Sequence, residues 1–241
     1  MSSMFNTAVK WSLVASNPAR ATSTPTIRSP RLTTPTASQL RGLAEAAVGT
    51  TWEIPVLLAT TTGARRAEIL GLRWSRIDLS RGRVRIHETL QRVEGQLAFV
   101  PPKTDRAKRE IPLPAFAVER LRAHKAEQGR RRLSLGSVWS DIDLVCERGD
   151  GGPLDPDGFT HGFARIAKAA GLDGVRLHDC RHGVATALAK AGTPAYVTSM
   201  VLGHSSVHFT ANTYQHADEE TVDRALAGLE QAFGQGSVPT A

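Results

Sequence analysis

The hydrophobic residues of this chain recur at helical spacing along most of residues 36–233, but between residues 74 and 113 the spacing changes to strand-like alternation. The residues that alternate with polar ones there are Val84, Ile86, Leu97 and Phe99. Turn signals separate these runs, and Ile111-Pro112-Leu113 closes the set, so we expect antiparallel hairpin strands. The sequence therefore predicts a mainly α fold with a small antiparallel β-sheet, which is an α+β fold class.

Start and stop signals bound the predicted helices. Thr36 and Gln39 form a capping box ahead of the first apolar stripe, Thr193-Pro194 is a good N-cap and N1 pair, and Gly203 is a helix-terminating glycine. The predicted helices cover about 36–47, 51–61, 64–72, 115–128, 159–171, 184–192, 194–203 and 222–233. Helices thus make up most of the compact region.

The N-terminal residues have a different organisation. Residues 1–17 form one amphipathic helix, with Phe5, Ala8, Val9 and Leu13 on its apolar face and nothing before it to cover that face. Residues 18–35 contain four prolines and many Ser and Thr residues, which is typical of an extended linker. We therefore expect 1–17 to be the last helix of an otherwise absent domain, 18–35 to be a linker, and 36–241 to be one compact domain.

The charge of the chain is unevenly distributed. Lysine and arginine number 30 against 23 acidic residues, and between Lys103 and Arg132 there are ten basic residues against four acidic ones. A concentrated basic segment favours a polyanionic partner, although a solvated basic helix would have the same composition.

Other classes of protein are excluded by features that the sequence lacks. No apolar run approaches the roughly 18 residues of a membrane span, and the N-terminus lacks the apolar stretch of a secretory signal. Cys146 and Cys180 are the two cysteines, and no CxxC motif is present, so we expect buried thiols. We expect a soluble, cytoplasmic protein without a membrane partner.

The segment from Thr62 to Glu68 opens a predicted helix with an arginine in its first turn. A cation there opposes the helix dipole, so a negative group should compensate for it. One candidate is a phosphate held by backbone N–H groups and by the guanidinium of Arg65. The other is an i,i+3 ion pair between Arg65 and Glu68 on an exposed face. This segment alone leaves both interpretations open.

Two further segments carry unusual polar residues. His178 and Arg181 lie three positions apart at a helix start, where they can reach the same oxygen, although Asp179 as a cap and two solvated histidines would also explain the segment. His204 follows the helix-terminating glycine, and ten residues later Tyr214 falls on an apolar face, where a tyrosine usually packs in the core. Neither segment identifies a function by itself.

Taken together, these segments resemble the catalytic domain of the tyrosine recombinases, the phage-integrase and Xer-like family, over nearly all of residues 36–233. The family pattern is a TGxR segment, a lysine in a β-hairpin, HxxR, a Gly-His after a helix and then a tyrosine. In this sequence it reads Thr62-Gly63-Ala64-Arg65, Lys103-Thr104, His178-Asp179-Cys180-Arg181, Leu202-Gly203-His204 and Tyr214. The resemblance implies the DNA breaking-rejoining fold, with residues 1–17 similar to the end of the family's core-binding domain.

The resemblance also implies a site-specific DNA recombinase, an integrase that cleaves and rejoins DNA through a covalent 3′-phosphotyrosyl intermediate. Tyr214 is then the nucleophile. The negative charge that builds on the nonbridging phosphate oxygens must be met by fixed cations, a task that suits the planar guanidinium groups of Arg65 and Arg181. One phosphodiester replaces another of similar energy, so we expect neither ATP nor a metal ion as cofactor.

The remaining roles follow from the same resemblance. His178 and His204 add hydrogen bonds to the phosphate, and His178 can also help to take the tyrosine proton. Lys103 is the expected general acid for the leaving 5′-oxygen. Glu68 supports the site without touching phosphate. The residues expected to contact DNA beside Lys103 are Arg106, Lys108 and Arg109.

The expected partner is a double-stranded DNA attachment site, on which the full-length protein forms a homotetramer. We expect a bacterial or phage-encoded protein that associates with the nucleoid. Two alternatives remain open. The chain could be a catalytically silent DNA-binding remnant that acts as a regulator. It could also be a metal-dependent hydrolase, because His178/His182 and His204/His208 have i,i+4 spacing, although neither pair has the Glu of an HExxH motif.

Overall fold

The structure is a computed structural model of the chain, and it describes residues 2–22, 34–101 and 108–203. The chain divides into two compact units, Met1–Leu32 and Thr33–Ala241, and each unit is described by itself. The predicted helix at 222–233 lies outside the described residues. In the part of the chain that the structure describes, none of the helices combines the length and apolar character that a membrane-spanning segment requires.

The first unit contains a short helix, α1 (Ser2–Lys10), and a 3-10 turn, η1 (Pro18–Arg20). The helix ends earlier than the predicted residue 17, because Ser12 adopts a left-handed conformation with φ 55°. The Asn17 side chain then links the following segment to α1, since its amide donates to the Ser2 carbonyl at 3.0 Å and to Asn6 Oδ1 at 2.7 Å. No residue of α1 is buried within this unit.

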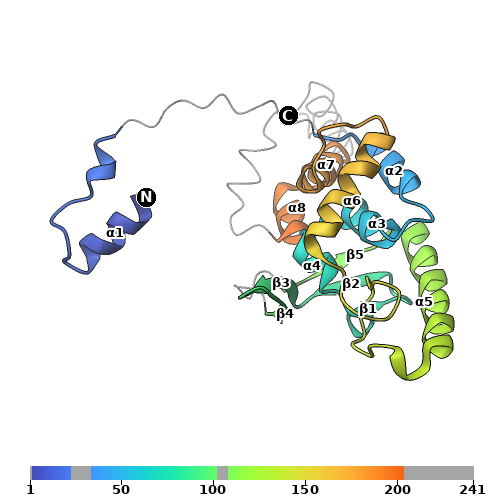
Figure 1. Cartoon of the computed structure of the whole chain (residues 1–241). Coiled ribbons are helices and arrows are strands. Elements are labelled where there is room, and N and C mark those ends of the chain that lie inside the picture. Colours follow the sequence, from blue (N-terminus) through green and yellow to red (C-terminus); the bar gives the residue numbers. More distant parts are fainter. Residues whose placement is uncertain (1, 23–33, 102–107, 204–241) are drawn as a thin grey trace, which may run out of the picture. The chain divides into compact units, whose positions relative to one another are not determined.

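The second unit is built from helices around a buried central one. Its helices are α2 (Ala37–Ala46), α3 (Glu53–Thr62), α4 (Arg66–Leu70), α5 (Ala115–Leu135), α6 (Pro156–Ala169), α7 (Leu177–Lys190) and α8 (Ala195–Leu202). Helix α3 packs against α2, α4, α5 and α7, and almost all of its residues are buried. Most helices gather on one side of this unit, the strands lie on the other, and α5 runs along the edge (Figure 1).

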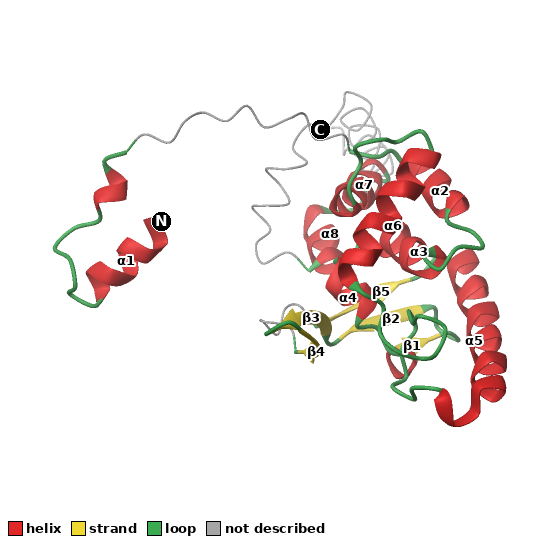
Figure 2. Cartoon of the chain, viewed as in Figure 1, coloured by secondary structure: helices red, strands yellow, loops and turns green. Residues whose placement is uncertain are grey.

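The strands form two small antiparallel sheets. One has the order β1 (Ile77–Asp78), β2 (Arg83–Ile86), β5 (Arg109–Pro112), and the other pairs β3 (Thr89–Val93) with β4 (Gln96–Val100) (Figure 2). Val84 of β2 lies opposite Ile111 of β5. The predicted α+β class is confirmed, and the strand set predicted from the alternation proves to be two separate sheets.

The helix caps confirm one prediction and correct another. Thr36 Oγ1 accepts the N–H of Gln39 at 3.3 Å, and the Gln39 side chain accepts the N–H of Thr36 at 2.9 Å, so the predicted capping box is present. The predicted Thr193 N-cap is wrong. Pro194 occupies that position with an extended ψ of 141°, because the N–H of Thr193 bonds to Leu188 O and keeps Thr193 at the end of α7.

Helix α5 runs past its predicted end at residue 128 because distant acidic groups hold its basic second half. Arg131 forms an ion pair with Glu147, and Arg132 forms one with Asp141 at 2.6 Å. Arg120, nearer the start, pairs with Glu53 of α3 and Glu127. Much of the positive charge that the sequence concentrates here is therefore neutralised within the fold.

Both cysteines lie in the core, as predicted. Cys146 and Cys180 are buried and not bonded to each other. Burial raises the pKa of the Cys180 thiol to about 12 and also raises that of Cys146. Cys180 fills its position on α7 as a small hydrophobic residue.

Gly63 ends α3 in the left-handed conformation, with φ 61°, and a Cβ built there would lie 2.7 Å from Leu202 Cδ2. We expect Gly63→Ala to lower the free energy of unfolding by about 2–4 kcal/mol, the sum of backbone strain and crowding. Gly49→Ala is the matched control, because φ is 74° and nothing lies within 4 Å of its Cβ position. Urea unfolding of both variants measures the difference, and equal losses would contradict the role of crowding.

Candidate active site

A tight turn between α3 and α4 carries the first candidate arginine. Thr62 Oγ1 accepts the N–H of Ala64 at 3.1 Å, and Gly63 closes α3 through its N–H to Ala59 O. Arg65 is the N-cap residue of α4, so its side chain projects from the turn and not from the body of a helix. The helix that was predicted to begin at residue 64 begins at Arg66.

Glu68 supplies the negative group that Arg65 was expected to need. One Glu68 oxygen accepts the backbone N–H of Arg65 at 2.8 Å, and the other accepts Nη1 of the Arg65 guanidinium at 2.9 Å. The predicted i,i+3 ion pair is therefore present, but Glu68 is only 3% exposed, whereas Arg65 is 44% exposed. Arg65 is thus held on a buried carboxylate while part of its guanidinium faces solvent.

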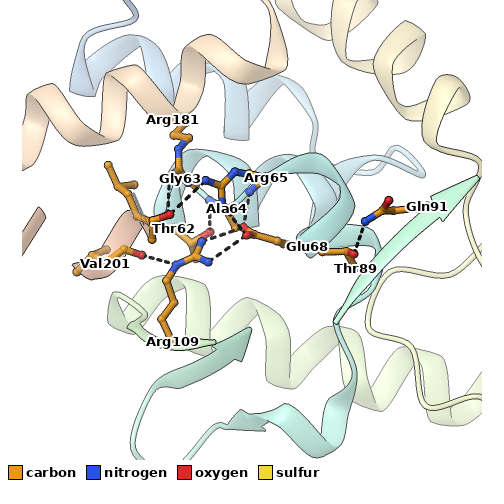
Figure 3. A network of polar contacts seen from close by, with 12 residues as sticks. Thr62, Gly63, Ala64, Arg65, Glu68, Thr89, Gln91, Arg109, Arg181 and Val201 are labelled. Atoms are coloured by element: carbon orange, nitrogen blue, oxygen red, sulfur yellow. Dashed lines mark hydrogen bonds and ion pairs between the residues drawn. The ribbon is translucent and has the colours of Figure 1, made fainter. Parts of the chain in front are cut away.

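Arg109 contacts the same carboxylate from the other side. Its Nη1 and Nη2 donate to the two Glu68 oxygens at 3.0 and 2.8 Å, and its Nε donates to Val201 O at 2.8 Å (Figure 3). Burial alone would raise the pKa of Glu68, but the hydrogen bonds and charge of Arg109, with those of Arg65, outweigh it and hold this pKa below its ordinary value. Glu68 is therefore ionised at neutral pH.

The second candidate arginine, Arg181, is buried on α7. Its Nη1 donates to Gly63 O at 2.9 Å, and its Nη2 donates to Leu202 O. Arg65 completes this arrangement, because its Nη2 donates to Gly203 O at 3.2 Å. Two guanidinium groups thus connect the turn after α3 with the end of α8, although these segments lie far apart in the sequence.

His178 lies on the first turn of α7, beside His182. The two imidazole rings are 5.0 Å apart and nearly perpendicular. Partial burial first, and then the charges of His182 and Arg181, lower the pKa of His178 below its ordinary value. The neutral form of His178, which can accept a proton, is therefore favoured.

The cap proposed for this helix is also present. Asp179 is buried and accepts the backbone N–H of Arg176 at 2.8 Å. The capping interpretation of the segment thus holds for Asp179, while Arg181 turns inward toward the turn after α3. Among residues 2–22, 34–101 and 108–203, no three His, Cys, Asp or Glu side chains lie close enough together to hold a metal ion.

The remaining predicted residues fall into two groups. Lys103, Arg106, His204 and Tyr214 lie outside the described residues, although Lys103 and Arg106 belong to the segment between β4 and β5, and His204 directly follows Gly203. Lys108 is exposed and directly precedes β5.

Arg109 differs from the surface position that was expected for a DNA contact. Its side chain is 5% exposed, and so enclosed a group fits a role inside the site better than a contact with the DNA backbone. A signal for this was present in the sequence, because Arg109 stands two residues before Ile111 and alternate residues of a strand share a face. Ile111 is in the core.

The chain is similar to known proteins over most of its length. The sequence profile of the phage integrase family matches residues 31–221. A XerC-like tyrosine recombinase of Caldanaerobacter subterraneus subsp. tengcongensis is 29% identical over 207 residues, which are 81% of this chain and 53% of the relative. An integrase of Streptomyces ambofaciens is 26% identical over 83% of this chain and 53% of its own length. The chain thus spans about half the length of these curated relatives.

Solved structures share the fold. The Tn1549 transposon integrase in complex with circular intermediate DNA superposes with a TM-score of 0.75 at 19% identity, covering 95% of this chain and 76% of that one. The XerA recombinase superposes with a TM-score of 0.64 at 22% identity, covering 85% of this chain and 66% of that one. At these identities the similarity establishes the fold.

Proposed function

Because the chain belongs to the phage integrase family, the tyrosine recombinases, we propose that it cleaves and rejoins DNA at specific sites through a covalent 3′-phosphotyrosyl intermediate. Tyr214 is the proposed nucleophile. Its hydroxyl oxygen forms a bond to the scissile phosphorus, the bond from phosphorus to the 5′-oxygen breaks, and a second attack by a 5′-hydroxyl reverses the exchange.

One observation supports this proposal above the others, namely that Arg65 and Arg181 meet at the same pair of turns. Arg65 bonds to Gly203 O, and Arg181 bonds to Gly63 O, so each arginine is fixed by the segment that carries another family motif. Cations held in place before the reaction stabilise developing negative charge without a cost of reorganisation. The charge of a phosphate beside these arginines would be met by two guanidinium groups.

Proton transfers complete the proposed reaction. His178 accepts the phenol proton of Tyr214, and Lys103 donates a proton to the leaving 5′-oxygen. His204 adds a hydrogen bond to the phosphate. Glu68 stays behind the arginines, as its burial and its bonds to Arg65 and Arg109 favour.

Double-stranded DNA is the proposed substrate and partner. Among the proteins of the same fold, the Tn1549 integrase is in complex with DNA, and the XerH recombinase is bound to its difH substrate. The basic residues of the segment before β5, including Arg106 and Lys108, would lie along this DNA. Residues 1–17, 18–35 and 36–241 are proposed as the end of a core-binding domain, a linker and the catalytic domain, with assembly into a tetramer on DNA in the full-length protein.

Covalent capture tests the proposal directly. The chain is incubated with and without EDTA with nicked DNA duplexes of random sequence, and DNA that resists removal by denaturant is recovered with its attached peptide. We expect a peptide that contains Tyr214 joined to a 3′-phosphate. An adduct on another residue would reassign the nucleophile, DNA binding without any adduct would indicate a silent DNA-binding protein, and loss of the adduct in EDTA would indicate a metal-dependent enzyme.

The pH dependence of adduct formation tests the role of His178. A base must be neutral to accept a proton, so the rate should fall as the pH drops through the pKa of His178, which lies below 6.5. The charge of His182 is one cause of the lowered pKa of His178. The substitution His182→Asn removes this cause, so the acidic limb of the pH–rate profile should move to higher pH. Single-turnover rates between about pH 5 and pH 8 measure the limb.

His161→Asn is the control for this shift, because His161 is exposed and lies on a different helix, α6. We expect its acid limb to match that of the unchanged chain. An acid limb that stays in place in His182→Asn, or that moves to lower pH, would exclude His178 as the base.

A further inference from the structure

The buried ion pair between Arg109 and Glu68 is not explained by contact with DNA or by the proton transfers. Both side chains are almost fully buried, with Arg109 5% and Glu68 3% exposed. Hydrogen bonds to the two Glu68 oxygens and to Val201 O orient the Arg109 guanidinium. A planar guanidinium that donates to three acceptors has a fixed orientation, so it does more than balance the charge of Glu68.

This guanidinium joins three segments that carry proposed catalytic residues. Arg109 is the first residue of β5 and so lies just after the segment of Lys103. Glu68 in turn holds the backbone and the guanidinium of Arg65. Val201 lies in the last turn of α8, two residues before Gly203, whose carbonyl accepts a hydrogen bond from Arg65.

The end of α8 is fitted closely around Arg109. A Cβ at Gly203 would lie 2.9 Å from Arg109 Nη1 and 3.0 Å from its Cδ, so only a glycine lets the two meet without displacement. Gly203 has φ 69°, which places its carbonyl where Arg65 Nη2 can donate to it. Arg109 therefore touches both groups that fix Arg65, the Glu68 carboxylate and the Gly203 turn.

Stability alone gives little reason for such a pair. A buried ion pair loses the hydration of both charges, and well-packed apolar residues of the same volume often stabilise a protein as much or more. A pair that costs hydration and also orients a neighbouring arginine is better explained by the geometry that it maintains.

We propose that Arg109 is a positioning residue that sets the orientation of Arg65 toward the scissile phosphate through Glu68 and the Gly203 turn. This inference rests on the proposed recombinase function. Arg109 itself does not touch the substrate in this arrangement. Its loss should weaken the contact between Arg65 and a nonbridging phosphate oxygen while leaving the affinity for DNA unchanged.

Arg109→Lys tests this proposal, because an ammonium keeps the positive charge but cannot reach both Glu68 oxygens and Val201 O in one plane. Using the duplex recovered by covalent capture, we expect the single-turnover cleavage rate to fall about 100-fold, as a small misplacement of a catalytic group can produce. Arg85→Lys is the matched control, since Arg85 pairs with Glu110 on the neighbouring strand but is 59% exposed. We expect it to cleave at the rate of the unchanged chain.

A substrate with a methylphosphonate at the scissile position separates positioning from general damage. This substrate lacks the negative charge on one nonbridging oxygen, so its cleavage depends less on Arg65. The loss of cleavage rate caused by Arg109→Lys should therefore be about tenfold smaller on this substrate. Equal penalties on both substrates, or a weakened affinity that accounts for the whole loss, would overturn the proposal. So would a similar loss in Arg85→Lys.

Folding and the proposed function are checked in the same series. Thermal unfolding shows whether Arg109→Lys is folded at the assay temperature, and Arg109→Met, which keeps an unbranched side chain but removes the charge and the donors, provides the same substrate comparison if it is not. Absence of cleavage by the unchanged chain would count against the recombinase function. Normal cleavage by the unchanged chain and by both Arg109 variants would count against the positioning role alone.

Discussion

Tyr214→Phe is expected to abolish the covalent protein–DNA adduct while leaving the affinity for DNA intact. The substitution removes one hydroxyl oxygen and keeps the aromatic ring, so it tests chemistry more than packing. A nucleophile cannot be replaced by its neighbours within an assembled site, and losses on the order of 10⁴-fold or more are usual when one is removed. Gel analysis of denatured reactions measures the adduct, and a binding assay with the same duplex measures the affinity.

The size of this effect depends on the cations that surround the phenol. A free tyrosine has a pKa of about 10, so only about one molecule in a thousand is ionised at pH 7. In the proposed reaction the positive charges of Arg65 and Arg181 favour the phenolate, and His178 accepts its proton. Without the hydroxyl these groups have nothing to activate.

The chain offers its own control, because it contains two tyrosines. Tyr196 lies on α8 and is 59% exposed. Tyr196→Phe should form the adduct at the rate of the unchanged chain. If the adduct instead survived in Tyr214→Phe, or disappeared in Tyr196→Phe, the nucleophile would have to be assigned elsewhere.

Arg181→Lys is expected to reduce the cleavage rate by about 10²- to 10³-fold, the usual cost of removing one fixed donor from a developing anion. The guanidinium reaches Gly63 O and Leu202 O at once, which a lysine ammonium at the end of a flexible chain does not reproduce. The variant therefore keeps the charge and loses the orientation. Single-turnover cleavage at saturating DNA measures the effect.

Arg176→Lys at the N-cap of the same helix is the matched control. Arg176 pairs with Asp179 but is 65% exposed, so we expect a nearly normal cleavage rate. Thermal unfolding of both variants shows whether the rate loss reflects unfolded protein. A folded Arg181→Lys protein with normal cleavage would exclude a requirement for the planar guanidinium.

Local signals predicted the elements whose ends depend on neighbouring residues. The capping box at Thr36 is an example, because its two hydrogen bonds join residues three apart in the sequence. The i,i+3 pair of Arg65 and Glu68 is another. In both cases the partners lie on one turn of helix, where spacing alone decides whether they meet.

Several features that depend on distant partners were not predicted. The Glu68 carboxylate was expected on an exposed face, and its burial follows from Arg109, which lies 41 positions further on. Helix α5 was expected to end at residue 128, but Glu147 and Asp141 extend it to Leu135. At residue 193 a good capping residue was available, and a bond to the preceding helix prevented its use.

The ion pairs along α5 determine how affinity for DNA should respond to ionic strength. Each basic side chain that neutralises a phosphate of duplex DNA adds roughly 0.9 to the slope of log affinity against log salt concentration. Arg120, Arg131 and Arg132 already have carboxylate partners, so they are less available to neutralise phosphates. The slope then counts the phosphates that are contacted, and the formal charge of +7 is a poor guide to how tightly this chain holds DNA at physiological salt.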